Sequence, residues 1–195
     1  SGGAGVGKSK LGVKILEELS KKDYVPIVIQ SSGVSLWDDY QHLFKRQSFN
    51  QALLRAEVKV DTEFDINSLP ANDRDVIAFK QNMSGSNSEF IKNTIGKLYD
   101  KFGKFKTTEG INGNQNKRTY LFLTSLSAGN VLGSCSLDSN RNWGNFYIVY
   151  NAGLKDGHTI MHECGHSLSW PHVFQEGSRA RHTFYHGDTD NNMEY

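Results

Sequence analysis

Three histidines and a glutamate stand close together in the stretch HTIMHECGHSLSWPH, residues 158–172. His162 and His166 are four residues apart, so on a helix they share one face, one turn apart. Both imidazoles can then bind one metal ion at about 2.0–2.1 Å, whereas Glu163 is rotated by about 100° around the helix axis. Glu163 can therefore reach a water on the metal without being a ligand. This is the HExxH arrangement of two zinc ligands and a general base.

A catalytic zinc ion needs a third protein ligand and an open fourth position. His172 follows His166 by six residues, and a continuous helix would turn it by about 600°, away from the first two histidines. Pro171 predicts that the helix ends before this point, because proline cannot continue the hydrogen-bond ladder and disfavours helix at the preceding residue. The sequence therefore predicts one catalytic Zn²⁺ held by His162, His166 and His172.

The motif HECGHSLSWPH, followed by DTDNNMEY, resembles the HExxHxxGxxH motif and Met-turn of the metzincin clan of zinc metallopeptidases. The resemblance implies that Met193 forms a hydrophobic floor under the metal and that Tyr195 approaches the metal. Ser169 stands where the clan has glycine, so we expect a non-helical residue at 169 or 170. The segment HTFYHGDTDNNMEY also resembles, more loosely, metallopeptidase domains of bacterial secretion-system and polymorphic-toxin proteins, which implies delivery outside the producing cell.

Hydrophobic periodicity upstream of the motif predicts both helices and strands. The predicted strands are residues 24–30, 56–66, 119–126, 131–137 and 146–153. The predicted helices are residues 10–21, 35–56 and 86–103, followed by the helix that carries the metal motif. The order of these elements indicates an α+β or mixed α/β fold. Residue Pro26 favours an edge strand or an early strand position for 24–30, and residues 57–64 alternate as in a half-buried strand.

The metzincin resemblance implies a twisted mixed sheet with an antiparallel edge strand, a backing helix and an active-site helix. Residues 86–103 match the backing helix and residues 131–137 match the edge strand. In that fold Gly133, Ser134, Cys135 and Ser136 would hydrogen-bond an extended protein or peptide substrate by strand addition. The other interpretation of residues 131–137 is an ordinary hairpin strand.

The bulk composition fits one globular domain with a hydrophobic core, since the chain has 195 residues of which 37% are hydrophobic. The formal net charge of +1 gives no basic excess of the kind that binds nucleic acid, and no apolar run is long enough to span a membrane. We expect an N-terminal helical and linker region over residues 1–50 and a metzincin-like catalytic domain over 51–195. The chain shows no signal peptide, no initiator Met and no helix after the Met-turn, so we expect a piece of a longer polypeptide.

Two other functions stay open beside a zinc metalloendopeptidase. One is a non-catalytic or latent zinc-binding interaction module. The other is nucleotide binding, because GGAGVGKS, from Gly2 to Ser9, matches the P-loop pattern. A P-loop follows a strand, however, and only Ser1 precedes this one, so a Gly-rich linker also explains it. Of the remaining candidate ligands, His158 is expected as a cap or surface residue and Cys164 as a small core residue.

Overall fold

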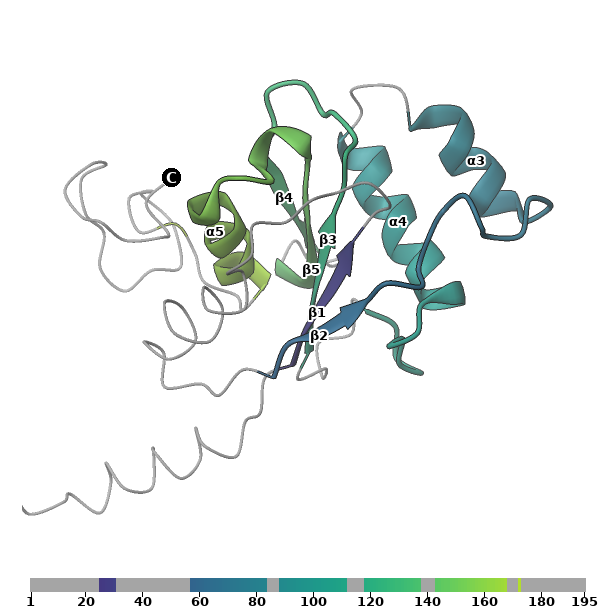
Figure 1. The fold of residues 1–195 in the computed structure, drawn as a ribbon, viewed down its shortest axis with the longest axis horizontal. Helices are drawn as coiled ribbons and strands as arrows, with labels where there is room; N and C mark the ends of the chain where they lie inside the picture. Colours follow the sequence, from purple (N-terminus) through teal and green to yellow (C-terminus); the bar gives the residue numbers. More distant parts are fainter. Residues whose placement is uncertain are drawn as a thin grey trace, which may run out of the picture.

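The computed structural model describes residues 25–30, 57–83, 88–111, 118–137, 143–167 and 172. Its elements in chain order are β1 (Val25–Gln30), β2 (Lys59–Asp61), α3 (Arg74–Asn82), α4 (Ser88–Phe102), β3 (Arg118–Leu123), β4 (Gly133–Leu137), β5 (Trp143–Val149), the 3-10 helix η2 (Asn151–Gly153) and α5 (Gly157–Ser167). Figure 1 shows them as one sheet with helices on both sides. Among the described helices, none is long and apolar enough to cross a membrane.

The five strands form one mixed sheet in the order β2-β1-β3-β5-β4. Strands β2, β1, β3 and β5 run parallel to one another, and β4 pairs antiparallel with β5 at the edge. The expected α+β class and mixed sheet are therefore confirmed, and the antiparallel edge strand lies at Gly133–Leu137, within the predicted residues 131–137. Strand β3 is buried along almost its whole length, as parallel strands covered on both faces are.

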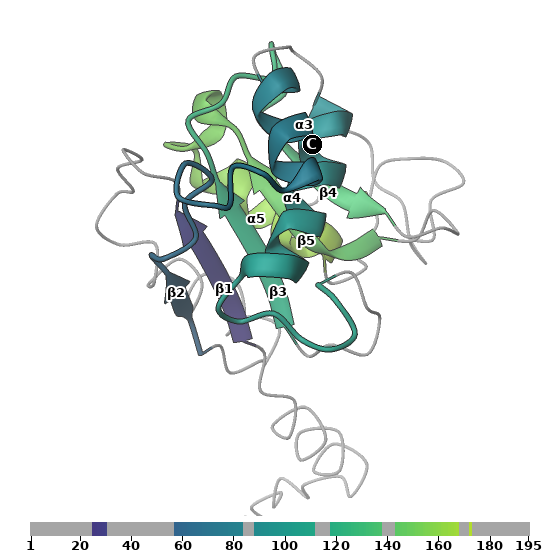
Figure 2. The same ribbon diagram turned by 90° about the vertical axis from the view of Figure 1, so that its right-hand side faces the viewer.

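Strand β1 lies inside the sheet, between β2 and β3 (Figure 2). It pairs with β3 over its full length, and its pairing with β2 begins at Ile27. The alternative of an edge strand is therefore wrong, whereas the early strand position expected for Pro26 is confirmed. We expected a domain boundary at residue 50. Strand β1 precedes this boundary but belongs to the same sheet as the strands that follow it. The rest of residues 1–50, including the P-loop-like stretch, lies outside the described residues.

The two faces of the sheet are covered by different helices (Figure 1). Helix α5 packs on β5 and β4, while α4 lies against the opposite face and carries α3 on its outer side. Tyr99 of α4 is fully buried and contacts the rings of Phe64, Tyr120 and Phe122 edge-to-face, with centroid separations of 4.9, 5.6 and 5.5 Å. This aromatic cluster holds α4 on the sheet, because each edge-to-face pair adds to the burial of apolar area.

Asp61 departs from the predicted alternation of residues 57–64. That alternation would put Asp61, with Lys59 and Glu63, on the polar face of a longer strand, but β2 ends at Asp61 and its side chain is completely buried. The carboxylate accepts four hydrogen bonds, from the N–H groups of Glu63 (3.0 Å), Phe64 (3.2 Å) and Lys104 (3.2 Å) and from the Tyr99 hydroxyl (2.7 Å). Asp61 therefore joins the end of β2 to the end of α4.

Helix α3 was not expected from the sequence. Its start is marked by Asp73, whose carboxylate accepts hydrogen bonds from the N–H groups of Asp75 (2.9 Å) and Val76 (3.2 Å). This N-cap is a signal that the sequence contains, because aspartate before an apolar-periodic run is typical of a helix start. The helix buries Val76 and Phe79 against the rest of the core.

Candidate metal site

Helix α5 begins at an N-cap formed by Asp156. Its carboxylate accepts hydrogen bonds from His158 N–H (3.0 Å), Thr159 N–H (3.3 Å) and the Thr159 hydroxyl (2.6 Å). His158 is exposed, in agreement with a surface position. The helix buries Ile160, Met161 and Cys164. These contacts fix the start and the rotation of the helix, and with them the direction of its histidines.

The other end of α5 is tied to the sheet through Ser167, its last residue. The Ser167 hydroxyl lies 2.6 Å from the Thr119 hydroxyl of β3 and donates to the Cys164 carbonyl at 2.7 Å. The helix does not continue to His172, as the position of Pro171 predicted. Residues 168–171 lie outside the described residues, so the expected non-helical residue at 169 or 170 stays a prediction.

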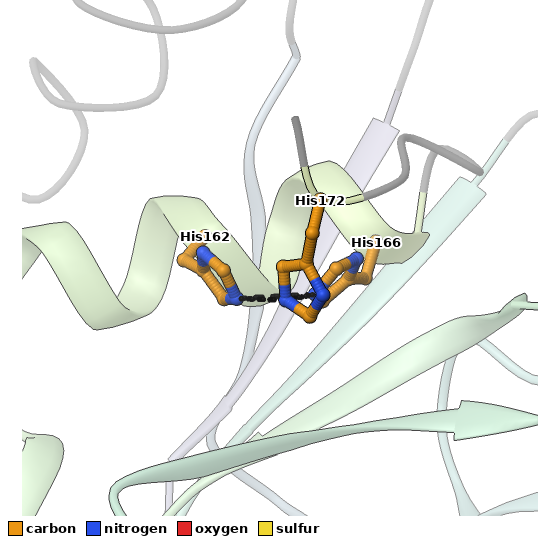
Figure 3. Close-up of side chains that lie close together, drawn as sticks. All are labelled: His162, His166 and His172. Atoms are coloured by element: carbon orange, nitrogen blue, oxygen red, sulfur yellow. Dashed lines mark hydrogen bonds between the residues drawn. The ribbon is translucent and has the colours of Figure 1, made fainter. Parts of the chain in front are cut away.

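His162, His166 and His172 come together, as the spacing predicted (Figure 3). The Nε2 atom of His166 lies 3.1 Å from that of His162 and 3.0 Å from that of His172, and the remaining pair is 3.2 Å apart. The first two side chains come from neighbouring turns of α5, and the third reaches back from beyond the helix end. His162 and His166 are buried and His172 is half-buried.

The three nitrogen atoms fit a metal ion better than they fit one another. An imidazole Nε2 carries either one proton or one lone pair, so three mutually close Nε2 atoms cannot all be satisfied by hydrogen bonds among themselves. One cation between them accepts all three lone pairs. With bonds of about 2.0–2.1 Å, a tetrahedral ion places its ligand atoms about 3.3 Å apart, close to the observed separations. The triad is therefore a group that can hold one metal ion.

Glu163 belongs to the same helix but not to the group of converging ligand atoms, which among the described residues is the three histidines. Burial raises the pKa of its carboxyl to about 7, against the opposing effects of the Lys92 ammonium and of a hydrogen bond from the Cys135 backbone N–H. A carboxyl group with a pKa near neutral can both accept and return a proton at neutral pH. Glu163 is therefore not one of the converging ligands, and it can exchange a proton near neutral pH.

Lys92 is a part of the site that we did not expect. It lies on α4 with only 5% of its surface exposed, and its ammonium donates to the Ser134 hydroxyl of β4 at 3.2 Å and pairs with Glu89 at 3.1 Å. A buried ammonium needs such partners. The sequence gives no signal for it, because one lysine in an amphipathic helix is normally solvated.

The edge strand β4 presents alternate residues to its two sides. Leu132 accepts a hydrogen bond from Tyr150 N–H at 2.9 Å, and Ser134 lies opposite Ile148, so these residues direct their backbone groups toward β5. In an antiparallel pair the residues between them point the other way. The backbone groups of Gly133 and Cys135 therefore face the free edge of the sheet, on the side where a further strand would add.

Cys135 and Cys164 are both buried and free. Burial raises the pKa of the Cys135 thiol well above its usual range and raises that of Cys164 to about 12. Both thiols therefore stay protonated at neutral pH, whereas metal binding needs the thiolate. This agrees with the core role expected for Cys164. Met193, Tyr195 and Ser169 lie outside the described residues, and their expected roles stay predictions.

No protein-family model and no curated protein matches this chain.

Because the pKa of Glu163 is raised, we expect the free energy of unfolding of the metal-free protein to fall as the pH rises. Its ordinary value is 4.5 and its folded value is about 7, so the folded state holds the proton more tightly than the unfolded state. This contribution to stability is complete below pH 4.5 and is lost as the pH rises through 7. In EDTA-treated protein, we therefore expect Glu163→Gln to be more stable than wild type at pH 8, by up to about 3 kcal/mol.

Denaturant unfolding of both proteins at pH 5 and pH 8 tests this difference. The histidines titrate in both proteins, so their effect cancels in the comparison. If the two proteins differ in free energy of unfolding by the same amount at both pH values, the pKa of Glu163 is not raised in the folded protein.

Proposed function

We propose that the protein is a zinc-dependent metalloendopeptidase. The observation that carries the proposal is the convergence of the His162, His166 and His172 Nε2 atoms, 3.0–3.2 Å apart, beside a buried glutamate that is not one of the converging groups. Three histidine ligands leave one position of a tetrahedral ion open, as in catalytic rather than structural zinc sites. A bound zinc ion supplies an acidic water and polarises a carbonyl group.

Glu163 would carry out the proton transfers of peptide hydrolysis, which its place next to His162 in the sequence and its raised pKa support. It accepts the proton of the water that attacks the carbonyl and then returns it to the leaving amine. Burial keeps the carboxyl group out of bulk water, which favours this exchange near neutral pH. The rings of His162 and His166 are held in place because α5 is capped by Asp156 and is tied to β3 through Ser167 and Thr119.

The substrate in this proposal is an extended segment of a protein or peptide. Gly133 and Cys135 direct their backbone groups toward the free edge of β4, where an added strand can pair with them. Ser134 and Ser136 complete the strand, with Ser134 held by Lys92 from the opposite face. This arrangement supports an endopeptidase rather than an exopeptidase, because pairing along a strand needs no free end of the substrate.

A metzincin-like fold is part of the same proposal. The sheet with its antiparallel edge strand, the helix α4 behind it and the helix α5 in front support it. In this fold Met193 would form the floor of the site and Tyr195 would approach the metal. Delivery of the domain outside the producing cell, as a secreted effector or toxin, is proposed from the resemblance alone.

A latent or non-catalytic metal-binding module is the second candidate. The observation that favours it is the close contact of the Glu163 side chain with Gly133, where an added Cβ would lie 2.7 Å from Glu163 Cγ, so the proposed base packs on the edge strand. The two candidates differ in one result, which is cleavage of a peptide by the zinc-loaded protein.

The variant Glu163→Gln tests the proposed function directly. We expect it to bind one zinc ion per chain as the wild type does, because Glu163 is not one of the converging ligands. We expect kcat for a cleaved peptide to fall by about 10²–10⁴-fold, the usual contribution of a general base. The measurement is mass spectrometry of a peptide library incubated with each zinc-loaded protein. Equal cleavage by the variant would contradict the mechanism, and no cleavage by either protein would favour the latent module.

A further inference from the structure

A cavity of about 150 Å³ lies between the sheet and helices α3 and α4. Its inner wall is apolar and mostly aromatic, with Phe64 from the segment after β2, Phe79 from α3, Ile95 from α4 and Phe122 from β3. None of these four residues is more than 6% exposed. Protein cores rarely contain voids larger than a water molecule, because an unfilled cavity destabilises the fold. A cavity of this size therefore indicates a binding site.

The cavity opens to the surface at the carboxyl ends of two strands that run parallel. Asn67, which follows β2, and Ser125, which follows β3, both line the cavity and are exposed. The crevice outside the carboxyl ends of the strands is the usual ligand site of an open α/β sheet. Helix α5, which carries His162 and His166, covers the opposite face of the sheet (Figure 1). The cavity is therefore separate from the candidate metal site.

Asp65 gives the wall of the cavity its charge. It is half-buried, and among the described residues that line the cavity it is the one with an ionisable side chain. Its Oδ1 atom accepts a hydrogen bond from Asn67 N–H at 3.0 Å, and its carbonyl accepts one from Ser68 N–H at 3.0 Å. These bonds hold the carboxylate in a fixed turn. A negative charge beside an apolar cavity favours a ligand that carries a positive charge.

We propose that this cavity binds a small aromatic amine in its protonated form, with one ring in the apolar part and the ammonium group beside Asp65. The size of the cavity sets the size of the ligand, because an apolar cavity of about 150 Å³ holds a molecule like benzene. The rings of Phe64 and Phe122 supply edge-to-face partners for an aromatic ligand. The proposal adds a second binding site to the protein and does not depend on peptidase activity.

Methyl NMR of the full-length, EDTA-treated protein tests the site with three probes of similar size. Benzylamine is a cation, benzyl alcohol is neutral and benzoate is an anion. We expect benzylamine to shift the methyl signals of Met83 and Ile95, which line the cavity, and to leave that of Met161 on α5 unchanged. We expect a Kd on the order of 1 mM for benzylamine, about fivefold below that for benzyl alcohol, with benzoate weakest.

Two variants separate the charge from the volume. Asp65→Asn keeps an acceptor for Asn67 N–H and removes the charge, so the Kd for benzylamine should rise about fivefold while that for benzyl alcohol stays the same. Leu126→Trp places a large side chain in the cavity and should abolish binding of both. Leu69→Trp is its matched control, because Leu69 packs on the same core but does not line the cavity, and both Kd values should stay as in wild type.

Three results would overturn the proposal. The first is the absence of shifts at Met83 and Ile95 with every probe. The second is equal affinity for benzylamine and benzyl alcohol, or for benzylamine in wild type and in Asp65→Asn, because the ligand would then not be selected by its charge. The third is a set of shifts confined to Met161, which would place the amine at the histidine triad. If Leu126→Trp does not fold, the comparison of wild type with Asp65→Asn decides.

Discussion

Replacement of His166 by alanine should abolish tight zinc binding. The His166 Nε2 atom lies 3.1 Å from that of His162 and 3.0 Å from that of His172, so it is one of three nearly equivalent ligand atoms. The variant leaves two imidazoles, which is fewer protein ligands than catalytic zinc sites use. We expect the dissociation constant for Zn²⁺ to rise by about 10³-fold or more, measured by competition with a chromogenic chelator.

His158→Ala is the control for this experiment. His158 lies on the same helix, is exposed and does not belong to the converging group, so its variant should bind zinc as the wild type does. Zinc should also raise the Tm of wild type and of His158→Ala but not that of His166→Ala, because a ligand stabilises the folded state in proportion to its affinity. One tightly bound zinc ion per chain in His166→Ala would show that the triad is not the metal site.

Removal of the Asp61 carboxylate should destabilise the fold more than any other change proposed for the core. In Asp61→Ala, the Phe64 N–H and the Tyr99 hydroxyl lose their acceptor in a buried place, and the N–H groups of Glu63 and Lys104 lose it in a partly buried one. Each unsatisfied buried donor costs about 1–3 kcal/mol, so we expect a loss of about 3–5 kcal/mol in the free energy of unfolding, measured by urea denaturation.

Asp65→Ala is the matched control for Asp61→Ala. Asp65 also caps a turn, but its carboxylate accepts one exposed hydrogen bond, from Asn67 N–H at 3.0 Å. We expect this variant to lose less than about 1 kcal/mol. Equal losses in the two aspartate variants would mean that the buried network around Tyr99 contributes nothing beyond an ordinary turn.

Local spacing was enough to predict the metal triad. The i,i+4 pair of His162 and His166 needs only helix geometry, and Pro171 made the return of His172 predictable, because proline acts on its immediate neighbours. The edge strand was predictable for a similar reason, since it is a short run between polar segments. These features depend on interactions within a few residues along the chain.

Features that depend on distant partners could not be predicted. Asp61 looked like a polar-face residue because its donors Tyr99 and Lys104 lie on another element. Lys92 looked like a solvated lysine because Ser134, its partner, belongs to a strand that the helix meets only in the folded protein. The contact between Gly133 and Glu163 is of the same kind. In each case the sequence carries the residue and the tertiary structure supplies its environment.

The place of β1 in the sheet has a consequence for how the chain folds during synthesis. Val25 of β1 pairs with Arg118 of β3, so β1 leaves the ribosome long before its main partner. At usual rates of translation the delay is on the order of ten seconds, during which an apolar strand has one or both edges unpaired. Pro26 lies in this strand, and a proline cannot donate to a neighbouring chain. It therefore shortens the edge that is open to aggregation, while the two-sided pairing of the finished sheet begins after it, at Ile27.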